Sequence, residues 1–506
     1  MVGTHLEVER KYDAAPEARL PDLTRLPGVA GVAEPEQYDL DAVYFDTADL
    51  ALARGRITLR RRTGGHDAGW HLKLPAGTSG RQEVRLPLGR ARKHPPRELR
   101  TATLAYTRGA DLAPVAMLRT SRTVHRLLGR DGSCLAEVCA DEVNAFDGSS
   151  SHSLLAWREW EVELVEGDAE LLTRVDAVMA SVGVSVAQAP SKLARVLGDR
   201  ITPPPSPPRP CRKGPIGALL QTRLAEQLEV LKRRDVDVRR DANDGIHQLR
   251  VAMRRLRSAL ATFRPLVDRE VTDPLRDELQ WVAALLGEAR DAEVMAQRLD
   301  TAVSKLPGEL VLGAVTTRID LTLGNRYREG LATALEAMES RRYVELLNAL
   351  DRLVADPPWT PLGDQPAKDV LPTLLKRDWK RLRKQVSRAD SAADPHTRDV
   401  ALHESRKAAK RLRYAAETAR PVLGKDAKQI TSVAKAAQTR LGDHQDSVVT
   451  RSVLRDLGIQ AHLDGDTAFT FGLLHGLEQT HAVMIEQEFS RTWKTTYAPK
   501  LRALLR

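Results

Sequence analysis

Two patterns of sequence meet at Thr202-Pro203-Pro204-Pro205-Ser206-Pro207-Pro208-Arg209-Pro210. Proline lacks a backbone N–H and has a fixed φ, so this run can neither enter a helix interior nor complete the ladder of a sheet. We therefore predict a semi-rigid linker over residues 202–213. A chain of 506 residues also exceeds one hydrophobic core, which stops growing near roughly 250–300 residues. The sequence thus predicts two domains, 1–201 and 214–506, on either side of this linker.

Before the linker, apolar residues alternate with polar ones, as in Trp160-Glu161-Val162-Glu163-Leu164. A period of two is typical of β-strands whose two faces differ chemically. Several of these strands carry charge on one face and apolar residues on much of the other. Such a sheet can close into a barrel with its charged face inside if helices cover the outside. Candidate covering helices lie near residues 16–26 and 170–183.

Two strands of this part carry rows of carboxylates on one face. The residues that share a face are Glu7, Glu9 and Lys11 in one strand, and Glu159, Glu161 and Glu163 in the other. Like charges placed in this way repel unless a cation lies between them, and carboxylate oxygens suit hard cations such as Mg2+ or Mn2+. The sequence therefore predicts a metal site at these rows.

Other strands carry basic residues on a single face. These residues are Arg56, Arg60 and Arg62; Lys73; Arg81 and Arg85; and Arg122 and Arg126. Arginine can bind phosphate oxygens in bidentate fashion, which lysine cannot do. A solvated surface explains any one such face more simply. Here whole rows are either acidic or basic. This repetition favours a site that binds a metal at one end and phosphate along its walls.

The N-terminal residues resemble the CYTH family, also called the triphosphate tunnel metalloenzymes. The matching motifs, in chain order, are the ExExK at Glu7, Glu9 and Lys11, Tyr44-Phe45-Asp46-Thr47, Leu59-Arg60-Arg61-Arg62, Lys73, Arg122, Asp141, the ExExE ending at Glu163, and Ser191-Lys192-Leu193. The resemblance covers roughly the first 200 residues. It implies an eight-stranded antiparallel β tunnel with covering helices, so that the whole chain is an α+β protein of two domains.

The same resemblance implies roles for individual residues of the tunnel. Triphosphate would be held by Lys11, Arg60, Arg62, Lys73, Arg122 and Lys192. The metal, Mg2+ or Mn2+, would be held by Glu7, Glu9, Asp141, Glu161 and Glu163, with Glu159 a weaker candidate. Glu7, Glu9 and Lys11 would serve in catalysis of phosphoanhydride hydrolysis.

After the linker, segments rich in Leu, Ala, Arg and Glu with apolar spacings of three and four predict an all-helical domain. One pattern in it occurs twice, because Ile246-His247-Gln248-Leu249-Arg250 returns as Leu402-His403-Glu404-Ser405-Arg406. Each copy is followed about one helix later by a Leu-Gly pair, at 286–287 and at 441–442. We therefore predict a duplicated helical bundle.

Each copy of the repeat places a basic stripe along one helix, since positions i, i+3, i+7 and i+10 share a face. The stripes hold His247, Arg250, Arg254 and Arg257 in the first copy, and His403, Arg406, Lys410 and Arg413 in the second. One basic stripe is usually a solvated face, whereas two that match residue by residue suggest a bound polyanion. These features resemble the CHAD domain, the conserved-histidine α-helical domain. The resemblance covers about residues 214–506 and implies that the stripes bind inorganic polyphosphate.

Composition limits the partners and the compartment. The net charge of +10 allows an anionic partner, and an aromatic content of 4% disfavours nucleic acid bound by base stacking. Three cysteines without CxxC spacing fit a reducing cytoplasm. An uninterrupted apolar run of about 18 residues is absent, so we predict no membrane association. The resemblance to CHAD adds polyphosphate granules as a place of association.

The leading hypothesis is metal-dependent hydrolysis of inorganic triphosphate or short polyphosphate in the tunnel, with polyphosphate binding or targeting by the helical domain. Two alternatives stay open. One is a non-catalytic polyphosphate-binding adaptor that uses both domains as anion sites. The other is a class IV-like adenylate cyclase, because the same tunnel could hold ATP.

Overall fold

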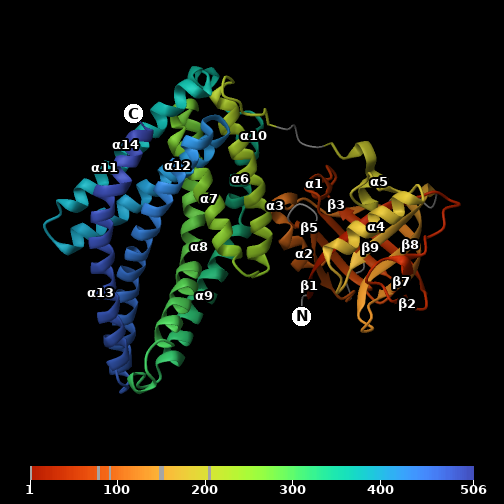
Figure 1. Cartoon of the computed structure of the whole chain (residues 1–506), viewed down its shortest axis with the longest axis horizontal. Coiled ribbons are helices and arrows are strands. Elements are labelled where there is room, and N and C mark those ends of the chain that lie inside the picture. The colour runs from red at the N-terminus through yellow and green to blue at the C-terminus, as the bar shows by residue number, and fades with distance from the viewer. Residues whose placement is uncertain (1–2, 77–79, 90–92, 148–152, 203–206, 506) are drawn as a thin grey trace. The chain divides into compact units, whose positions relative to one another are not determined.

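The computed structural model describes residues 3–76, 80–89, 93–147, 153–202 and 207–505, and the chain divides into two compact units, Met1–Pro204 and Pro205–Arg506 (Figure 1). Residues 203–206 of the predicted linker lie outside the described residues. The first unit is built from strands and the second from helices, as the two sequence patterns predict.

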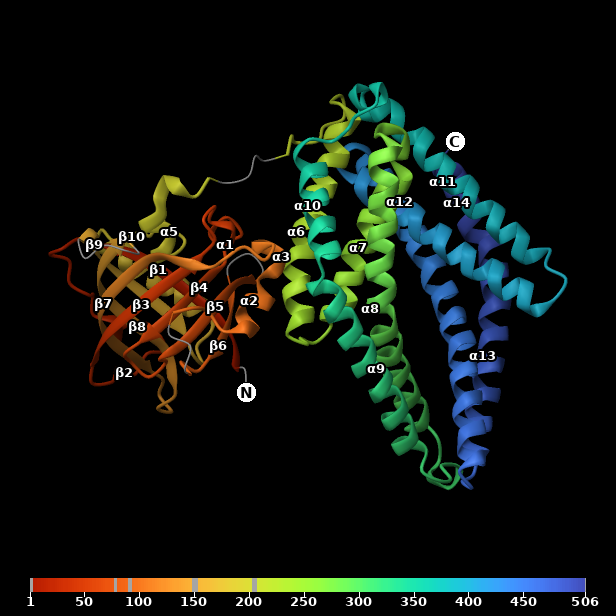
Figure 2. The ribbon, with the colours of Figure 1, turned by 180° about the vertical axis from the view of Figure 1, so that it is seen from behind.

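The first unit is a closed barrel of eight antiparallel strands. Its strands are β1 (Gly3–Ala14), β3 (Glu36–Asp46), β4 (Thr58–Thr63), β5 (Gly69–Ala76), β6 (Gly80–Leu86), β7 (Ala113–Leu128), β8 (Cys134–Asp147) and β9 (Ser153–Leu164). They follow one another in the order β1-β6-β5-β4-β3-β7-β8-β9, and β9 pairs back with β1 (Figure 2). Two short strands, β2 (Gly31–Val32) and β10 (Ser185–Val186), pair with β7 and β1. The predicted eight-stranded antiparallel barrel is confirmed.

Short elements connect or cover these strands. The helices of this unit are α1 (Ala51–Arg54), α2 (Arg97–Ala102), α3 (Leu104–Thr107), α4 (Ala169–Ser181) and α5 (Lys192–Leu197). Helix α4 covers the outer face, where Leu171 and Val175 share a buried cluster with Trp160 and Val162 of β9. The charged face of the strands therefore points inward.

The helix predicted near residues 16–26 is wrong. Only a 3-10 turn forms there, over Leu23–Arg25, with the carboxylate of Asp22 accepting a hydrogen bond from the backbone N–H of Thr24 at 3.1 Å. The segment contains Pro21, which supplies no backbone N–H, so a helix through it would lose a hydrogen bond. Leu23 still packs into the same outer cluster as α4. The segment thus covers the barrel without being a helix.

The second unit is all helical, as predicted. Its long helices are α6 (Ile216–Arg239), α7 (Gly245–Thr262), α8 (Arg269–Val303), α9 (Val315–Glu339), α10 (Arg341–Ala355), α11 (Ala367–Asp390), α12 (Pro395–Leu463) and α13 (Phe469–Thr492), and a short helix, α14 (Ala498–Leu504), follows. Helix α12 is broken at Gly424, where φ is 52° and ψ is −113°. Its two halves correspond to α7 and α8, so α6–α9 and α11–α13 are the two copies of the repeat.

The two copies join symmetrically where each begins. The backbone N–H of Ile216 donates to the carbonyl of Gln365 at 2.9 Å, and that of Ala367 donates to the carbonyl of Gly214, also at 2.9 Å. Within each copy a long helix packs on the next, α8 on α9 and α12 on α13 (Figure 2). Among the described helices of both units, none combines the length and the apolar character that crossing a lipid bilayer requires.

Candidate functional site

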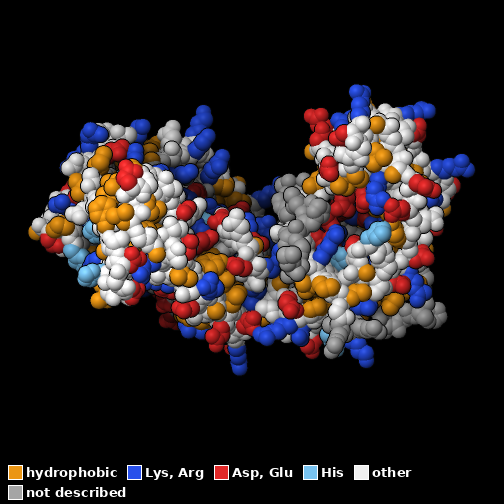
Figure 3. Space-filling model, turned by 90° about the horizontal axis from the view of Figure 1, so that it is seen from below, with side chains coloured by type: hydrophobic (Ala, Val, Ile, Leu, Met, Phe, Trp, Pro, Cys, Tyr) orange, Lys and Arg blue, Asp and Glu red, His pale blue; other side chains and the backbone are white. Residues whose placement is uncertain are grey.

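The barrel encloses a cavity of about 430 Å³ lined by charges of both signs. Acidic and basic side chains gather around a hollow on this unit (Figure 3). The predicted site residues that line the cavity are Glu7, Glu9, Lys11, Arg60, Arg62, Lys73, Arg122, Glu161, Glu163 and Lys192. Asp141 and Glu159 do not line it, but they are buried and bind Lys192. Arg56 also lies elsewhere, in a turn before β4 with a φ of 57°.

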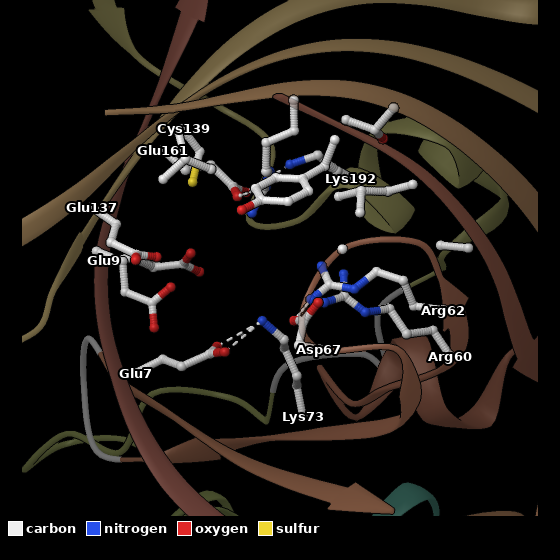
Figure 4. A pocket seen from close by; sticks show the side chains of 18 of the residues that line it. Glu7, Glu9, Arg60, Arg62, Asp67, Lys73, Glu137, Cys139, Glu161 and Lys192 are labelled. Atoms are coloured by element: carbon white, nitrogen blue, oxygen red, sulfur yellow. Dashed lines mark hydrogen bonds and ion pairs between the residues drawn. The ribbon is translucent and has the colours of Figure 1, made fainter. Parts of the chain in front are cut away.

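One wall of the cavity is acidic. The closed barrel places Glu9 of β1 and Glu137 of β8 on either side of Glu163 of β9, directly opposite it in both ladders, and Figure 4 shows Glu7, Glu9 and Glu137 on this side. Burial, followed by repulsion from Glu7, raises the pKa of Glu163 to about 7. Carboxylates crowded in this way are oxygen donors suited to a hard divalent cation, which would relieve their repulsion. The donor set therefore fits the predicted metal.

A second acidic cluster is already held by an ammonium group. Asp141, Glu159 and Glu161 form a buried group of carboxylates whose oxygens lie close together. The Nζ atom of Lys192 lies 2.9 Å, 2.6 Å and 2.8 Å from them, respectively. Arg122 also binds Asp141 through two hydrogen bonds of 2.7 Å. A metal at this cluster would have to displace Lys192, so the carboxylates around Glu163 fit a cation better.

The opposite wall is basic. Arg60 and Arg62 point into the cavity across from the acidic side (Figure 4). Burial, followed by the charges of Arg60 and Arg122, lowers the pKa of Arg62 to about 9. Its one ion-pair partner among the described residues is Asp67, from the turn between β4 and β5. Glu83, 4.0 Å from Arg60, is shared with Lys73 and Arg85, so one carboxylate serves three cations and the wall favours a bound anion.

One ion pair joins the two walls directly. The Nζ atom of Lys73 lies 2.8 Å and 2.7 Å from the two carboxylate oxygens of Glu7 (Figure 4). Lys11 likewise binds Glu9 at 3.0 Å. Although burial acts to lower it, the charges of Glu161 and Glu9 raise the pKa of Lys11 above its usual range. Residues predicted to bind metal and residues predicted to bind phosphate are thus neighbours.

Local helix caps position two of the matching motifs. The carboxylate of Asp46 accepts hydrogen bonds from the backbone N–H groups of Leu52 and Ala53 at 2.9 Å each, so it caps α1 rather than facing the cavity. The hydroxyl of Ser191 accepts from the N–H of Ala194 at 3.1 Å and caps α5. Because Lys192 is the first residue of that helix, the cap directs it toward the carboxylates.

Sequence reasoning missed Glu137 and Asp67 of the cavity lining and Glu83 buried behind it. Glu83 lies between Arg81 and Arg85 on β6, and the period of two places it on their face. It is fully buried and pairs with His71 at 2.8 Å. Glu137 follows the same rule, since it is two residues before Cys139 and four before Asp141 on β8. Both could have been found from alternation alone. Asp67 lies in a turn, where no period predicts its direction.

In the helical unit the two predicted stripes face each other. Burial, followed by the charges of Arg254, Arg406, Arg250 and Arg413, lowers the pKa of Lys410 to about 7. The charges that act on Lys410 therefore come from α7 as well as from the first half of α12, and these two helices are in contact. Among the described residues, neither Arg254 nor Arg406 forms an ion pair, and their Nε atoms are buried without a hydrogen-bond partner. The stripes thus form a concentrated, incompletely neutralised basic surface.

The repeated Leu-Gly pairs explain how the stripes are supported. A Cβ atom on Gly287 of α8 would lie 3.5 Å from the guanidinium of Arg250. A Cβ atom on Gly442 would lie 3.4 Å from Nε of Arg406. The glycines therefore let each arginine lie against the following helix. The last arginines of the stripes are also held alike, since Arg257 binds Gln280 and Arg413 binds Gln438.

The remaining stripe residues and their neighbours are arranged less uniformly. His247 and His403 are half-buried, and burial is the main cause that lowers the pKa of each. Arg411, the residue after Lys410, binds the buried Asp378 at 2.9 Å. Its role here is therefore an internal ion pair between α12 and α11.

Family models match both parts of the chain. The model described as the CYTH domain matches residues 5–187, and the model described as the CHAD domain matches residues 222–455. This chain belongs to the CYTH–CHAD family. The family resemblance predicted from the residue patterns is confirmed for both domains and for their order. The barrel is therefore the CYTH domain and the helical unit contains the CHAD domain.

Relatives of this CYTH–CHAD protein occur in two strains of Mycobacterium tuberculosis, as proteins named uncharacterized. Each is 41% identical over 493 residues, which covers 94% of this chain and 93% of the relative. Among solved structures, PptA from Streptomyces chartreusis matches with a TM-score of 0.47 and 23% identity, over 56% of this chain and 100% of that one. The CHAD domain from the plant Ricinus communis matches with a TM-score of 0.46 and 23% identity, over 59% of this chain and 95% of that one. Likeness at these scores supports no conclusion about function.

Proposed function

We propose that the CYTH barrel hydrolyses a terminal phosphoanhydride of inorganic triphosphate or short polyphosphate with Mg2+ or Mn2+, and that the CHAD domain binds polyphosphate. The observation that carries the proposal is one cavity that has both an acidic wall around Glu163 and a basic wall at Arg60 and Arg62. A metal with a triphosphate satisfies both walls together, because the carboxylates take the cation and the arginines take the phosphate oxygens.

In this proposal, different residues in and beside the cavity have different roles. Glu7, Glu9 and Glu163 would hold the cation, which supplies Lewis acidity to the phosphate oxygens and the attacking water. Lys73 exchanges its contact with Glu7 for a phosphate oxygen, while Arg60 orients the chain. Asp141 and Glu161 hold Arg122 and Lys192 in place, and they would reach a metal only if those cations turned to the phosphate. Burial of Glu7, Arg62, Glu161 and Lys192 in the barrel strengthens their charge interactions.

Polyphosphate binding by the CHAD domain is supported by the paired stripes. Arg254 and Arg406 have no ion-pair partner among the described residues, and the charges of both lower the pKa of Lys410. Clustered cations repel one another, and a polyanion along both stripes removes that repulsion. Each stripe spans about 15 Å along its helix, from ten residues at about 1.5 Å each. That length is enough to meet several successive phosphate groups.

The decisive experiment measures orthophosphate release by the full-length protein. The substrates are tripolyphosphate, long polyphosphate and ATP, each with Mg2+, with Mn2+ and with chelator. We expect metal-dependent release from tripolyphosphate. If the protein binds polyphosphate but releases no orthophosphate under any condition, it is a polyphosphate-binding adaptor and not a hydrolase. Formation of cyclic AMP from ATP, without orthophosphate, would replace it by an adenylate cyclase.

Polyphosphate binding should weaken as the pH rises through about 7. Lys410 has a pKa lowered to about 7, so it is an ammonium below that pH and a neutral amine above it. A polyanion favours the ammonium, so the affinity should fall by up to about tenfold per pH unit above 7. His247 and His403, whose pKa values are lowered, are neutral over this range.

Titration calorimetry of polyphosphate binding between pH 6 and pH 9 tests this prediction. Lys410→Arg supplies a permanent charge at the same position and should remove the dependence on pH above 7 while preserving binding. Equal pH profiles for Lys410→Arg and the wild type would contradict the role of Lys410.

The proposed compartment is the cytoplasm, with association to polyphosphate granules through the CHAD domain. Its support is chemical, since Cys134, Cys139 and Cys211 are free thiols, which a reducing compartment preserves. Imaging a tagged full-length protein beside stained polyphosphate tests the association.

A further inference from the structure

A second cavity lies in the helical unit, between two arms that its long helices form. The arm of α8 and α9 and the arm of α12 and α13 converge toward one tip (Figure 1, Figure 2). Residues of α8, of the loop after it, of the second half of α12 and of α13 line a cavity of about 680 Å³ there, which we call the inter-arm groove. Sites for small organic molecules have volumes of about 300–1,000 Å³. The groove is therefore large enough for such a molecule.

Leucine side chains form much of the apolar lining. Leu299 and Leu306 come from α8 and the loop after it, Leu454 comes from α12, and Leu474 and Leu477 come from α13. Three of them, at 299, 454 and 474, belong to the buried cluster at this end of the unit, whereas Leu477 is 51% exposed. Contact between this surface and water is unfavourable, so an aliphatic group that covers the leucines is favoured.

One ion pair joins the two arms at the groove. Nε and Nη2 of Arg298 on α8 donate hydrogen bonds to the two carboxylate oxygens of Glu478 on α13, at 3.0 Å and 2.8 Å. The hydroxyl of Ser447 donates to the same carboxylate at 2.6 Å. Although burial acts to raise it, these hydrogen bonds lower the pKa of Glu478. The carboxylate is therefore ionised, and its charge is balanced by Arg298.

Two cationic groups of the lining keep donors free. Nη1 of Arg298 forms no hydrogen bond with the residues that the structure describes. Lys305, in the loop after α8, likewise has no ion pair or hydrogen bond within the described ranges. Because Glu478 balances only Arg298, the charge of Lys305 remains uncompensated. Arginine and lysine donate and never accept hydrogen bonds, so these two groups favour an anion.

These cations do not belong to the duplicated pattern of the helical unit. The two Leu-Gly pairs of the repeat begin 155 residues apart, at 286 and at 441. The same offset places Val453 at the position of Arg298, and Gln460 at the position of Lys305. One copy thus has cations where the other has neutral side chains. The chemistry of the groove is therefore distinct from that of the two basic stripes, which correspond residue by residue.

We propose that the inter-arm groove binds an amphipathic anion of the fatty-acid class, with its aliphatic chain on the leucines and its carboxylate at Arg298 and Lys305. A carboxylate offers acceptors to both cationic groups, and charge-assisted hydrogen bonds of this kind are strong. A neutral aliphatic molecule would leave the donors unpaired, whereas inorganic phosphate would leave the leucines in contact with water. This site requires neither hydrolysis in the barrel nor polyphosphate binding at the stripes.

Titration calorimetry of the full-length protein with decanoate tests the proposal. 1-Decanol has the same chain without the charge, and acetate has the carboxylate without the chain. We expect decanoate to bind at one site, decanol to bind at least about tenfold more weakly, and acetate to give no measurable heat. Equal affinities for decanoate and decanol would overturn the anionic ligand, and no binding of decanoate would overturn the site.

Substitutions at two exposed positions place the binding in the groove. Leu477→Glu puts a carboxylate on the apolar lining, and Lys305→Glu reverses the uncompensated charge. Each should weaken decanoate binding by about tenfold or more, because the new carboxylate repels the ligand. The matched controls are Leu321→Glu on α9, where the leucine is 59% exposed, and Lys428→Glu on α12. Neither control residue lines the groove, so both variants should bind decanoate like the wild type.

Melting temperatures and polyphosphate affinities equal to those of the wild type show that the variants are folded. Wild-type affinity for decanoate in Leu477→Glu would overturn the groove as the site, and wild-type affinity in Lys305→Glu would overturn the position of the carboxylate. An equal loss in Leu321→Glu and Leu477→Glu would show unspecific adsorption to exposed leucines, which also overturns the proposal. Arg298 is kept in every variant, because its removal would leave Glu478 unpaired.

Discussion

Loss of hydrolysis by at least about 10³-fold is the expected result of replacing Glu7 and Glu9 together by glutamine. An amide has nearly the shape of the carboxylate but carries no charge, so it is a poor ligand for a hard cation. Glu9 lies directly opposite Glu163, and Glu7 holds Lys73. The double replacement therefore removes two proposed metal ligands and leaves the phosphate-binding arginines in place.

The measurement is orthophosphate release from tripolyphosphate over a range of Mg2+ and Mn2+ concentrations, with thermal unfolding as the check on folding. Glu142→Gln is the matched control, because Glu142 is an exposed glutamate of β8 whose ladder partner is Arg158. It should keep the activity and the melting temperature of the wild type. Undiminished turnover in the variant that lacks both Glu7 and Glu9 would contradict catalysis at this wall.

The second large effect concerns the CHAD domain. Replacing Arg254 and Arg406 by glutamine should weaken polyphosphate binding by about 10² to 10⁴, since a charge-assisted hydrogen bond contributes roughly 1.5–3 kcal/mol. These two arginines lack ion-pair partners among the described residues, so their removal leaves no carboxylate unpaired. The fold should therefore tolerate both changes, and release from tripolyphosphate in the barrel should persist.

Binding should be measured by calorimetry at several salt concentrations. The salt dependence should become shallower in the double variant, because fewer cations contact the polyanion. Arg341→Gln is the control, since Arg341 of α10 is 92% exposed and pairs only with Glu345 among the described residues. Retention of wild-type affinity after both replacements would show that polyphosphate binds elsewhere.

Much of the architecture is predictable because it follows from local periods. The alternation around Glu7 and Glu161 indicates inward-facing charge, and the spacing of Arg250, Arg254 and Arg257 indicates one face of a helix. The segment at 16–26 shows the limit of this reasoning. Its leucines pack on the barrel as a helix would pack, but Pro21 lies among them and only one turn forms. The leucines of this segment are enough to bury it against the barrel. A helix would also require a backbone N–H at each interior position, and Pro21 has none.

The site is less predictable than the fold, because its contacts join strands that are distant in the chain. Alternation shows that Glu163 faces inward, but only closure of the barrel reveals that Glu9 and Glu137 flank it. Lys192 comes from the first turn of a helix, and its family motif was the only signal for it. Asp67 comes from a turn. Tyr44 lines the cavity but could equally have packed outward, since an aromatic residue suits either face of a strand.

The pairing of β9 with β1 has a consequence for biosynthesis. Lys11 and Glu161, which meet across this seam, are 150 positions apart in the chain. Domains form as they emerge at about 5–20 residues per second, so the first strand must wait on the order of ten seconds for its last neighbour. During that time its alternating charged side chains keep the open edge hydrated and disfavour pairing with apolar strands. The same charges that are proposed to bind metal and phosphate thus protect the nascent edge from aggregation.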